Sequence, residues 1–294
     1  MAKPVTVFVT GGTGFIGQKC IKHLVEDGSD VRIIILTRKW IPSDENVTYI
    51  KGEISDNRLI SKVMSEYHPD VMLHLAWNVK NRGYEKNDEN IEWVKWSRNT
   101  VQTFLENGGR NLICSGTCFE YDSSGRELIK ESSVCRPNTL YGACKLKLYD
   151  ELEELCRRYK SRFVWGRVFY PYGPGEEKRK FITNVIETLE RGNRFVCSAP
   201  GNVADYIHVN DVANIFCRFT IEERFSGIYN VCTGEKMSIK QIVETIAERL
   251  GKKQMIDCSS EDGNSFLVGD RSRLDEAGLL CNYDFCTGLE TYFK

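Results

Sequence analysis

Residues 5–26 run from an apolar stretch through a glycine-rich turn into an amphipathic stretch: VTVFVT, GGTG, FIGQKCIKHLVE. Residues 5–10 predict a strand and residues 14–26 a helix. Gly11, Gly14 and Gly17 have G-x-x-G-x-x-G spacing at the junction. A side chain would block the tight turn at the first position, hold a pyrophosphate off the backbone at the second, and hold the helix off the sheet at the third. The segment predicts a pyrophosphate site at a helix N-terminus, and the strand–turn–helix context disfavours a glycine-rich turn without a ligand.

Strand and helix patterns alternate through the first half of the chain. Further apolar runs lie at 31–37, 47–52, 70–76, 111–116 and 162–168. Helical patterns lie between them at 56–67, 88–107 and 139–160. This alternation predicts an α/β fold with a doubly wound parallel sheet and helices on both faces.

The composition fits a globular protein and disfavours several partners. Of 294 residues, 41% are hydrophobic, and the net charge of −1 provides no field that would attract nucleic acid or an anionic membrane. No apolar stretch approaches the ~18 residues that suggest a transmembrane helix. We therefore expect neither a nucleic-acid partner nor a membrane partner.

The cysteines indicate a reducing compartment. There are 12, scattered and without a C-x-x-C pair, and the N-terminal MAKPVTVFVTGG lacks an apolar signal core. This pattern predicts buried, reduced thiols in a cytoplasmic protein and no metal site. His74, inside an apolar strand, is expected to be a core residue rather than a catalyst.

The end of the second predicted strand distinguishes between dinucleotides. An NAD site usually has Asp or Glu there for the ribose 2′-hydroxyl. The stretch LTRKWIPS at 36–43 has no acid, and it contains Arg38 and Lys39. These cations suit a 2′-phosphate and favour NADP(H) over NAD(H), with a pair of solvated basic residues as the alternative.

A second motif, YGACK, places Tyr141 and Lys145 one helical turn apart on one face. A phenol with a pKa of about 10 transfers protons poorly near neutrality, and a nearby ammonium lowers that pKa. The pair therefore predicts an acid–base unit. Thr117, at the end of a predicted strand, provides a hydroxyl able to hold the reacting oxygen.

These motifs together resemble the extended short-chain dehydrogenase/reductases, and most closely the NAD(P)-dependent epimerase/dehydratase family acting on nucleotide sugars. The resemblance runs from residue 7 to the GLETY near the C-terminus and includes TGGTGFIG, DVMLHLAW, SGTCFEYD and GRVFYPYGPG. It implies a Rossmann-type fold, a nucleotide-linked sugar as substrate and a homodimer. Thr117, Tyr141 and Lys145 become the catalytic residues, with Ser115 a weaker candidate than Thr117.

The resemblance also implies a division of the chain. Residues 1–168, with a returning segment at about 203–232, would form the NAD(P)-binding Rossmann domain. Residues 169–202 and 233–294 would form a smaller, interleaved α/β substrate lobe, in which helical patterns lie at about 178–191 and 238–250.

Further binding residues follow from the same resemblance. The cofactor contacts it implies are Gly11, Thr13, Gly14, Phe15, Ile16, Gly17, Thr37, Arg38, Lys39, Glu53, Ile54, Leu75, Ala76, Trp77, Asn90, Tyr141, Lys145 and Tyr170. The substrate contacts are Trp77, Lys80, Thr117, Cys118, Phe119, Tyr172 and Arg271. One departure concerns Ala204, where the family often has an arginine for the nucleotide diphosphate. Arg271, Lys178, Arg179 and Arg194 are the alternative sources of that contact.

The residues after Thr117 bear on the reaction. Dehydratases of the family usually have an acid pair there, because eliminating water needs a second acid and a base. Here Cys118 and Phe119 follow, and Glu120, on an extended stretch, would share a face with Cys118. Elimination is therefore disfavoured. NADP(H) favours net reduction, since cells generally keep that cofactor reduced. GTCFEYD, LYGACK and WGRVFYPYGPG also resemble sugar 4-ketoreductases, which implies a nucleotide-linked 4-keto-6-deoxy sugar as substrate. A 4-epimerase with tightly bound NAD is the alternative. A dinucleotide-sensing regulatory protein is a third possibility, which the intact Y-x-x-x-K disfavours.

Overall fold

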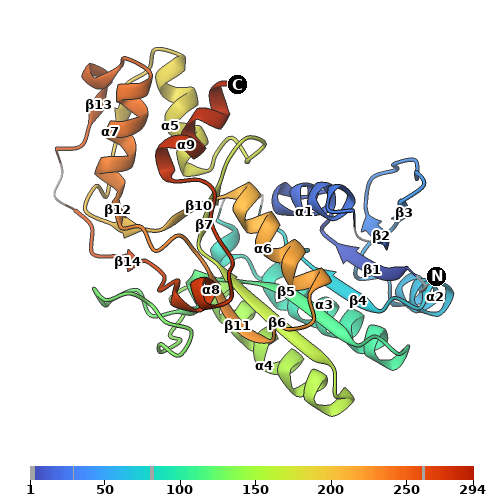
Figure 1. The fold of residues 1–294 in the computed structure, drawn as a ribbon. Coiled ribbons are helices and arrows are strands. Elements are labelled where there is room, and N and C mark those ends of the chain that lie inside the picture. Colours follow the sequence, from blue (N-terminus) through green and yellow to red (C-terminus); the bar gives the residue numbers. More distant parts are fainter. Residues whose placement is uncertain (1–3, 29, 80–82, 260–261) are drawn as a thin grey trace. The chain divides into compact units, whose positions relative to one another are not determined.

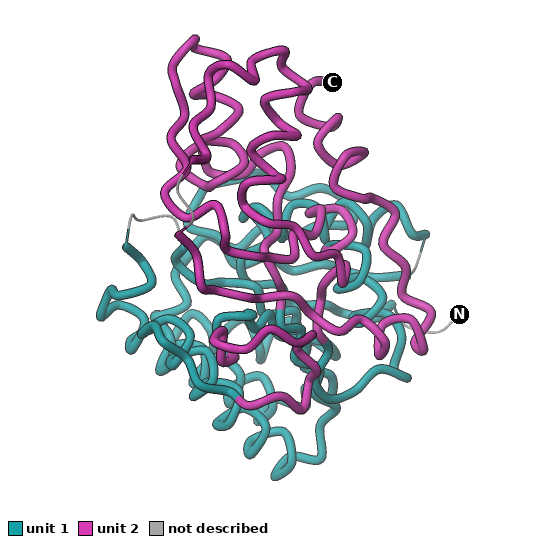
Figure 2. Tube along the Cα trace, turned by 90° about the vertical axis from the view of Figure 1, so that its left-hand side faces the viewer, with its two compact units in different colours: residues 1–120, 135–167, 213–229 teal, residues 121–134, 168–212, 230–294 magenta. Residues whose placement is uncertain are grey.

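The computed structural model describes residues 4–28, 30–79, 83–259 and 262–294. The chain divides into two compact units, drawn in different colours in Figure 2. Unit 1 comprises residues 1–120, 135–167 and 213–229, and unit 2 comprises residues 121–134, 168–212 and 230–294. The chain therefore passes between the units more than once.

A seven-stranded sheet forms the centre of unit 1. Its strand order is β11-β6-β5-β4-β1-β2-β3. The strands are β1 (Val5–Thr10), β2 (Val31–Thr37), β3 (Val47–Lys51), β4 (Val71–His74), β5 (Asn111–Thr117), β6 (Arg162–Val168) and β11 (Gly227–Val231). β1 pairs in parallel with β2 and β4, β2 with β3, and β4 with β5. The predicted α/β fold with a doubly wound parallel sheet is confirmed.

Helices cover both faces of this sheet because the strands are apolar on both sides. The helices are α1 (Phe15–Glu26), α2 (Asn57–Tyr67), α3 (Glu89–Glu106), α4 (Leu140–Tyr159) and α6 (Val209–Ile221). One core joins Phe8, Met72 and Leu112 of the sheet to side chains of α2, α3 and α4, such as Val101 and Leu148. Figure 1 shows α3 and α4 on one side of the sheet and α1 on the other.

The start of α4 is fixed locally, and this places the Y-x-x-x-K motif. Thr139 is the N-cap, and its side chain accepts a hydrogen bond from the Gly142 amide at 3.0 Å. A Cβ at Gly142 would lie 2.2 Å from the Phe119 carbonyl oxygen. Glycine therefore lets the first turn of α4 pack directly on the 3₁₀ helix η2 (Cys118–Glu120) that follows β5.

Unit 2 has its own core and several short strands. Its helices are α5 (Phe181–Glu190), α7 (Ile239–Arg249), α8 (Ser272–Glu276) and α9 (Phe285–Leu289). Its strands are β7 (Tyr170–Tyr172), β8 (Phe195–Val196), β9 (Val203–Ala204), β10 (Tyr206–His208), β12 (Met237–Ser238), β13 (Ile256–Asp257) and β14 (Phe266–Leu267). Apolar faces of α5, α7 and α9 meet in one cluster that includes Val185, Ile246 and Phe285.

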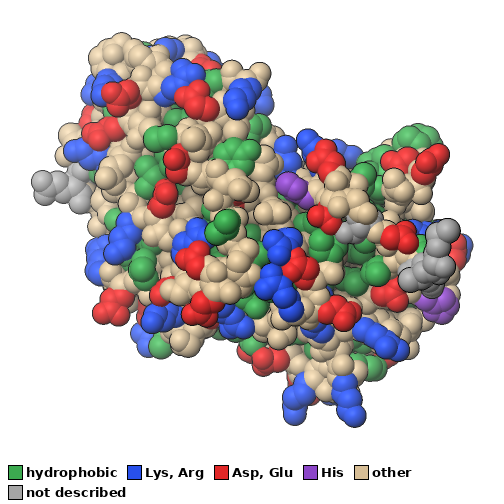
Figure 3. Space-filling view, in the orientation of Figure 1, with side chains coloured by type: hydrophobic (Ala, Val, Ile, Leu, Met, Phe, Trp, Pro, Cys, Tyr) green, Lys and Arg blue, Asp and Glu red, His purple; other side chains and the backbone are tan. Residues whose placement is uncertain are grey.

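The surface carries charges of both signs. On the face drawn in Figure 3, basic and acidic side chains are intermixed, in keeping with the net charge of −1. Among the residues that the structure describes, no helix is both long enough and apolar enough to cross a membrane.

Candidate active site

The glycine loop (residues 11–17) joins β1 to α1 in unit 1. Gly11 has a φ of +76°, which favours glycine, and a Cβ there would lie 2.7 Å from the Ala76 backbone nitrogen. A Cβ at Gly17 would lie 2.1 Å from the Gly11 carbonyl oxygen. Gly14 is the N-cap of α1, and no side chain within the described ranges caps that end. The first amides of α1 can therefore bind an anion, and the loop fits a dinucleotide pyrophosphate.

A cavity of about 280 Å³ adjoins this loop. Its lining residues are Gly12, Thr13, Gln18, Ile21, Lys39, Ile41 and Tyr49. Among the described residues, the cavity is thus lined by one lysine and by no carboxylate. Arg38 and Lys39 are both exposed, and Thr37 is buried, with its hydroxyl accepting a hydrogen bond from the Lys39 amide at 3.2 Å. Of the two predicted cations, Lys39 is the one that lines the cavity.

Other predicted cofactor residues of unit 1 lie at strand ends and at the start of α1. Thr13, Phe15 and Ile16 are partly exposed, Glu53 is exposed and Ile54 is buried. The Leu75 amide donates to the Thr10 carbonyl at 3.1 Å, which extends the β1–β4 ladder into the stretch that carries Ala76. These contacts are structural, and the cofactor roles of these residues stay predictions.

Asn90 and Trp77 hold the segment that follows β4. The Trp77 indole donates to the Asn90 side-chain oxygen at 2.7 Å, and the Asn90 amide group donates to the carbonyls of Tyr84 and Asn87. The Asn90 side chain therefore makes three hydrogen bonds within the protein. Lys80, a predicted substrate contact on this segment, lies outside the described residues.

His74 is a core residue, as expected. Its Nδ1 lies 2.7 Å from the Thr10 hydroxyl, and its Nε2 lies 2.9 Å from the Ser97 hydroxyl. Burial, followed by the nearby Lys145 charge, lowers the pKa of His74 to about 3. The imidazole is neutral near neutrality and has a partner for each ring nitrogen.

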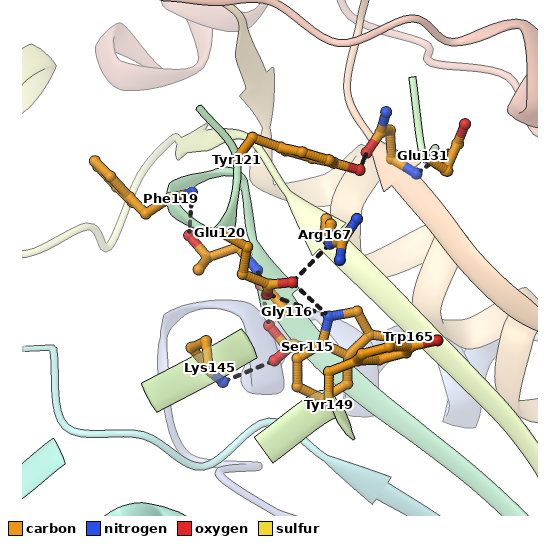
Figure 4. Close-up of polar contacts among 12 residues, drawn as sticks. Ser115, Gly116, Phe119, Glu120, Tyr121, Glu131, Lys145, Tyr149, Trp165 and Arg167 are labelled. Carbon is orange, nitrogen blue, oxygen red and sulfur yellow. Dashed lines mark hydrogen bonds and ion pairs between the residues drawn. The ribbon is translucent and has the colours of Figure 1, made fainter. Parts of the chain in front are cut away.

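The structure brings Thr117, Tyr141 and Lys145 together at the end of β5. We name residues 115–120 with Tyr141 and Lys145 the β5 corner. The Thr117 hydroxyl accepts from the Phe119 amide at 3.3 Å, and the Thr117 side chain hydrogen-bonds Tyr141. The Lys145 ammonium donates to the Ser115 carbonyl oxygen at 2.7 Å and lies 4.2 Å from the centre of the Trp77 ring. Figure 4 shows Lys145 pointing toward Ser115.

The electrostatics of the corner correct one expectation. We predicted that a neighbouring ammonium lowers the pKa of Tyr141, but the pKa of this phenol is raised well above its usual value. Burial is the main cause, followed by the Tyr84 phenol, while the hydrogen bond from Thr117 opposes both. Burial also lowers the pKa of Lys145 to about 8. Tyr141 in this state is a protonated phenol, able to donate a proton.

Aromatic rings enclose Tyr141. Ring centres lie 5.2 Å away for Tyr84, 6.1 Å for Trp77 and 6.2 Å for Phe119. All three pairs have edge-type geometry, which aromatic pairs favour. The phenol therefore faces an apolar wall rather than charged side chains on these sides.

Comparison with known proteins agrees with this geometry. The model of the NAD dependent epimerase/dehydratase family matches residues 7–232, which is more than half of the chain. The chain belongs to this family. It is accordingly an NAD(P)-dependent enzyme of the extended short-chain dehydrogenase/reductase type.

Three curated family relatives have different activities. A UDP-glucose 4-epimerase of Halalkalibacterium halodurans is 24% identical, with 84% of this chain and 81% of the relative covered. A dTDP-D-glucose 4,6-dehydratase of Mus musculus is 25% identical, with 82% and 72% covered. A dTDP-4-dehydro-6-deoxyglucose reductase of Escherichia coli is 23% identical, with 92% and 91% covered.

A solved structure shows the same fold. The UDP-glucose 4-epimerase of Thermus thermophilus, in complex with NAD, superposes with a TM-score of 0.84 at 21% identity. The superposition covers 98% of this chain and 97% of that one. The family fold thus extends over the whole chain, beyond residue 232.

Glu120 departs from its predicted conformation and is a feature that the sequence reasoning missed. Residues 118–120 form η2 rather than an extended stretch, so the prediction that Glu120 shares a strand face with Cys118 is wrong. The Glu120 carboxylate is fully buried and accepts from the Thr117 amide at 2.8 Å and from Arg167 at 2.6 Å. Arg167 is the one arginine in GRVFYPYGPG, and it follows Trp165 in an apolar stretch. A charged residue in such a setting was the only signal in the sequence that a buried acid lies nearby.

Three of the predicted binding residues belong to unit 2: Tyr170, a predicted cofactor contact, and Tyr172 and Arg271, predicted substrate contacts. Tyr170 stacks on Tyr206 with ring centres 5.2 Å apart, and the buried Tyr172 hydroxyl donates to the carbonyls of Asp284 and Phe285. Arg271 forms an ion pair with Asp275 at 2.8 Å and donates to two backbone carbonyls. These side chains have structural contacts within the unit. The cofactor role of Tyr170 and the substrate roles of Tyr172 and Arg271 stay predictions.

The alternative diphosphate candidates form surface ion pairs in the same unit. Lys178 pairs with Glu187, Arg179 with Glu177, and Arg194 with Asp257. Ala204 is buried in β9, where it pairs with Met237 of β12.

Proposed function

We propose that this protein uses NADPH to reduce the 4-keto group of a nucleotide-linked 4-keto-6-deoxy sugar. The observation that carries the proposal is the set of side chains that follow Thr117. Cys118 carries a buried thiol, and Phe119 is aromatic. The next residue, Glu120, has its carboxylate bonded to Arg167 and Trp165. Elimination of water needs a second acid and a base, and the carboxylate of this stretch is already held in a buried ion pair.

The state of Tyr141 supports reduction. A carbonyl that gains a hydride must also gain a proton, and a phenol that stays protonated near neutrality can supply it. The raised pKa of Tyr141 keeps this proton in place. Thr117 would hold the carbonyl oxygen beside the phenol, since its hydroxyl already hydrogen-bonds Tyr141.

Lys145 provides the positive charge of the site. Its ammonium would bind the nicotinamide ribose and favour the tyrosinate left after proton transfer. Bound NADPH would supply the hydride. The glycine loop would bind the pyrophosphate through the uncapped amides of α1.

The second strand supports NADP(H). Lys39 lines the cavity beside the glycine loop, and the cavity lining has no carboxylate to select a 2′-hydroxyl. Lys39→Asp should lower the affinity for NADPH roughly tenfold or more, as expected for loss of a charged hydrogen bond. Arg38→Asp should have a smaller effect, because Arg38 does not line this cavity. Calorimetry that finds equal affinity for NADPH and NADH, unchanged in Lys39→Asp, would contradict the assignment.

The two units would bind different molecules. Unit 1 holds the glycine loop and the β5 corner, and it would bind the dinucleotide. Unit 2 would bind the nucleotide-linked sugar, with Tyr172 and Arg271 as the candidate contacts. The activity of the E. coli relative, a dTDP-4-dehydro-6-deoxyglucose reductase, supports the choice of a 4-keto-6-deoxy substrate.

A 4-epimerase with tightly bound NAD is the second candidate. The similarity to the UDP-glucose 4-epimerase of H. halodurans favours it. An epimerase must retain its cofactor, whereas a reductase must release the oxidised form. The two differ in whether the cofactor is consumed.

Incubation with dTDP-4-dehydro-6-deoxyglucose and NADPH tests the proposal, with UDP-glucose assayed in parallel. The proposal predicts loss of NADPH absorbance in proportion to product, and retention of the 6-deoxy group in that product by mass spectrometry. Conversion of UDP-glucose into its 4-epimer without net cofactor change would establish the epimerase instead.

A further inference from the structure

A buried ion pair joins the β5 corner to β6. Glu120 and Arg167 have side-chain exposures of 0% and 2%, and Glu120 Oε2 lies 2.6 Å from Arg167 Nε. The Trp165 indole donates to both carboxylate oxygens, at 3.2 and 3.1 Å. Figure 4 shows Arg167 and Trp165 converging on the Glu120 carboxylate from β6. Removing two charges from water is costly, and a buried pair is by itself weak support for stability.

The Glu120 carboxylate also has a partner in Thr117, which is one of the predicted catalytic residues. Glu120 Oε1 accepts the backbone N–H of Thr117 at 2.8 Å. Thr117 is also the first residue of the turn, and its hydroxyl accepts a hydrogen bond from the Phe119 amide at 3.3 Å. The Thr117 hydroxyl in turn hydrogen-bonds Tyr141. The carboxylate thus ties the last residue of β5 into the η2 turn, and the turn orients the hydroxyl.

The space around the carboxylate is shaped for this contact. A Cβ at Gly116 would lie 2.2 Å from Trp165 Nε1 and 2.7 Å from Glu120 Oε1. Glycine at 116 therefore lets the indole and the carboxylate reach the backbone beside Thr117. The Gly142 contact described above closes the other side of η2, since its Cβ would meet the Phe119 carbonyl.

We propose that Glu120, anchored by Arg167 and Trp165, is a positioning residue that fixes the Thr117 hydroxyl toward Tyr141. Glu120 does not touch the reacting atoms; it acts through the Thr117 backbone. The inference rests on the proposed function for the identity of the reaction, but the geometry it describes exists without substrate.

Two double variants isolate the contact. Glu120→Gln/Arg167→Met keeps an oxygen that can accept the Thr117 N–H, whereas Glu120→Val/Arg167→Met removes it. Both variants remove the same two charges and the same guanidinium, and neutral replacement of a buried ion pair is often tolerated. A role in packing or charge alone predicts the same behaviour for both. A positioning role predicts that only the valine variant is impaired.

The first readout is the NMR resonance of the Tyr141 ring, observed in protein with ¹³C-labelled tyrosine and assigned with Tyr141→Phe. Thr117→Ala shows how loss of the Thr117–Tyr141 hydrogen bond displaces this resonance. The valine variant should reproduce that displacement, and the glutamine variant should keep the wild-type position. If the valine variant does not fold, a folded glutamine variant with a displaced resonance still overturns the proposal.

The second readout is turnover of dTDP-4-dehydro-6-deoxyglucose with NADPH. The kcat of the valine variant should fall roughly ten- to a hundredfold, the scale of a small misplacement of reacting groups. The glutamine variant should stay close to wild type, and both should bind NADPH alike. Equal kcat values for the two variants would overturn the proposal. Absence of turnover in the wild type would instead count against the proposed function, and the resonance would still decide the role of Glu120.

Discussion

The glycine loop and the β5 corner lie in the same unit and are built in opposite ways. The loop depends on the absence of side chains: a Cβ at Gly11 or Gly17 would collide with backbone atoms, and α1 presents its bare amides. The corner depends on side chains that enclose one another, with Lys145 at 3% exposure and Glu120 at 0%. The loop suits an anion that many dinucleotides share, whereas the role that we propose for the corner is one particular proton transfer. A change at Tyr141 should therefore impair the reaction more than cofactor binding, whereas a change in the loop should impair cofactor binding.

The largest effect should come from the corner. Tyr141→Phe removes the proton donor and keeps the ring that contacts Tyr84 and Trp77. We expect kcat to fall by about a hundred- to ten-thousand-fold, the contribution of general acid catalysis. Calorimetry should find NADPH affinity nearly unchanged. If affinity and kcat fell in parallel, the Tyr141 hydroxyl would be needed for cofactor binding and not only for proton transfer.

A smaller effect, on stability and cofactor affinity rather than on kcat, should come from a substitution in the glycine loop. Gly17→Ala places a methyl group 2.1 Å from the Gly11 carbonyl oxygen, so the loop must shift. The free energy of unfolding, measured with urea, should fall by about 1–3 kcal/mol, as for other overpacked sites, and NADPH affinity should fall with it.

Gly125→Ala is the matched control for the loop. A Cβ at Gly125 meets no atom within 4 Å. Its free energy of unfolding should stay within about 0.5 kcal/mol of wild type. If Gly17→Ala behaved like this control, the close packing of the loop would not be needed for binding.

The smallest effect is expected in the pH dependence of kcat/KM, which should distinguish the β5 corner from the glycine loop. The ammonium of Lys145 has a pKa of about 8 and is therefore charged below that pH and neutral above it. In the free enzyme this predicts that kcat/KM falls as pH rises through about 8, while the backbone amides of the loop do not titrate. Lys145→Arg keeps the charge and should move the fall to higher pH. A profile in which wild type and Lys145→Arg fall together would assign the change to another group.

The sequence was sufficient for the loop because its constraints are local. Glycine spacing between a strand and a helix determines the conformation over a few residues, and Gly11, Gly14 and Gly17 lie where they were predicted. The strands of unit 1 were equally predictable, since a continuous apolar run such as residues 31–37 signals a strand buried on both faces. The helix predicted at 139–160 is α4, with a Thr139 cap.

The sequence was insufficient for the corner because its constraints are tertiary. Glu120 lies in a 3₁₀ turn and accepts a hydrogen bond from Arg167, which is 47 positions along the chain. No local sequence pattern predicts that contact. The pKa of Tyr141 depends on burial and on the nearby Tyr84 phenol, and the spacing within YGACK reports neither. Helix α6 was also missed, because its first residues follow β10 directly without a turn signal.

The central claim is that the β5 corner performs a net reduction. NADPH deuterated at the transferable hydrogen of the nicotinamide tests it directly, with dTDP-4-dehydro-6-deoxyglucose as substrate. Our account predicts a product that carries deuterium at sugar C4, formed in equal amount with oxidised cofactor. Failure to reduce this substrate or to oxidise NADPH, together with conversion of UDP-glucose into its 4-epimer without net oxidation of cofactor, would contradict it.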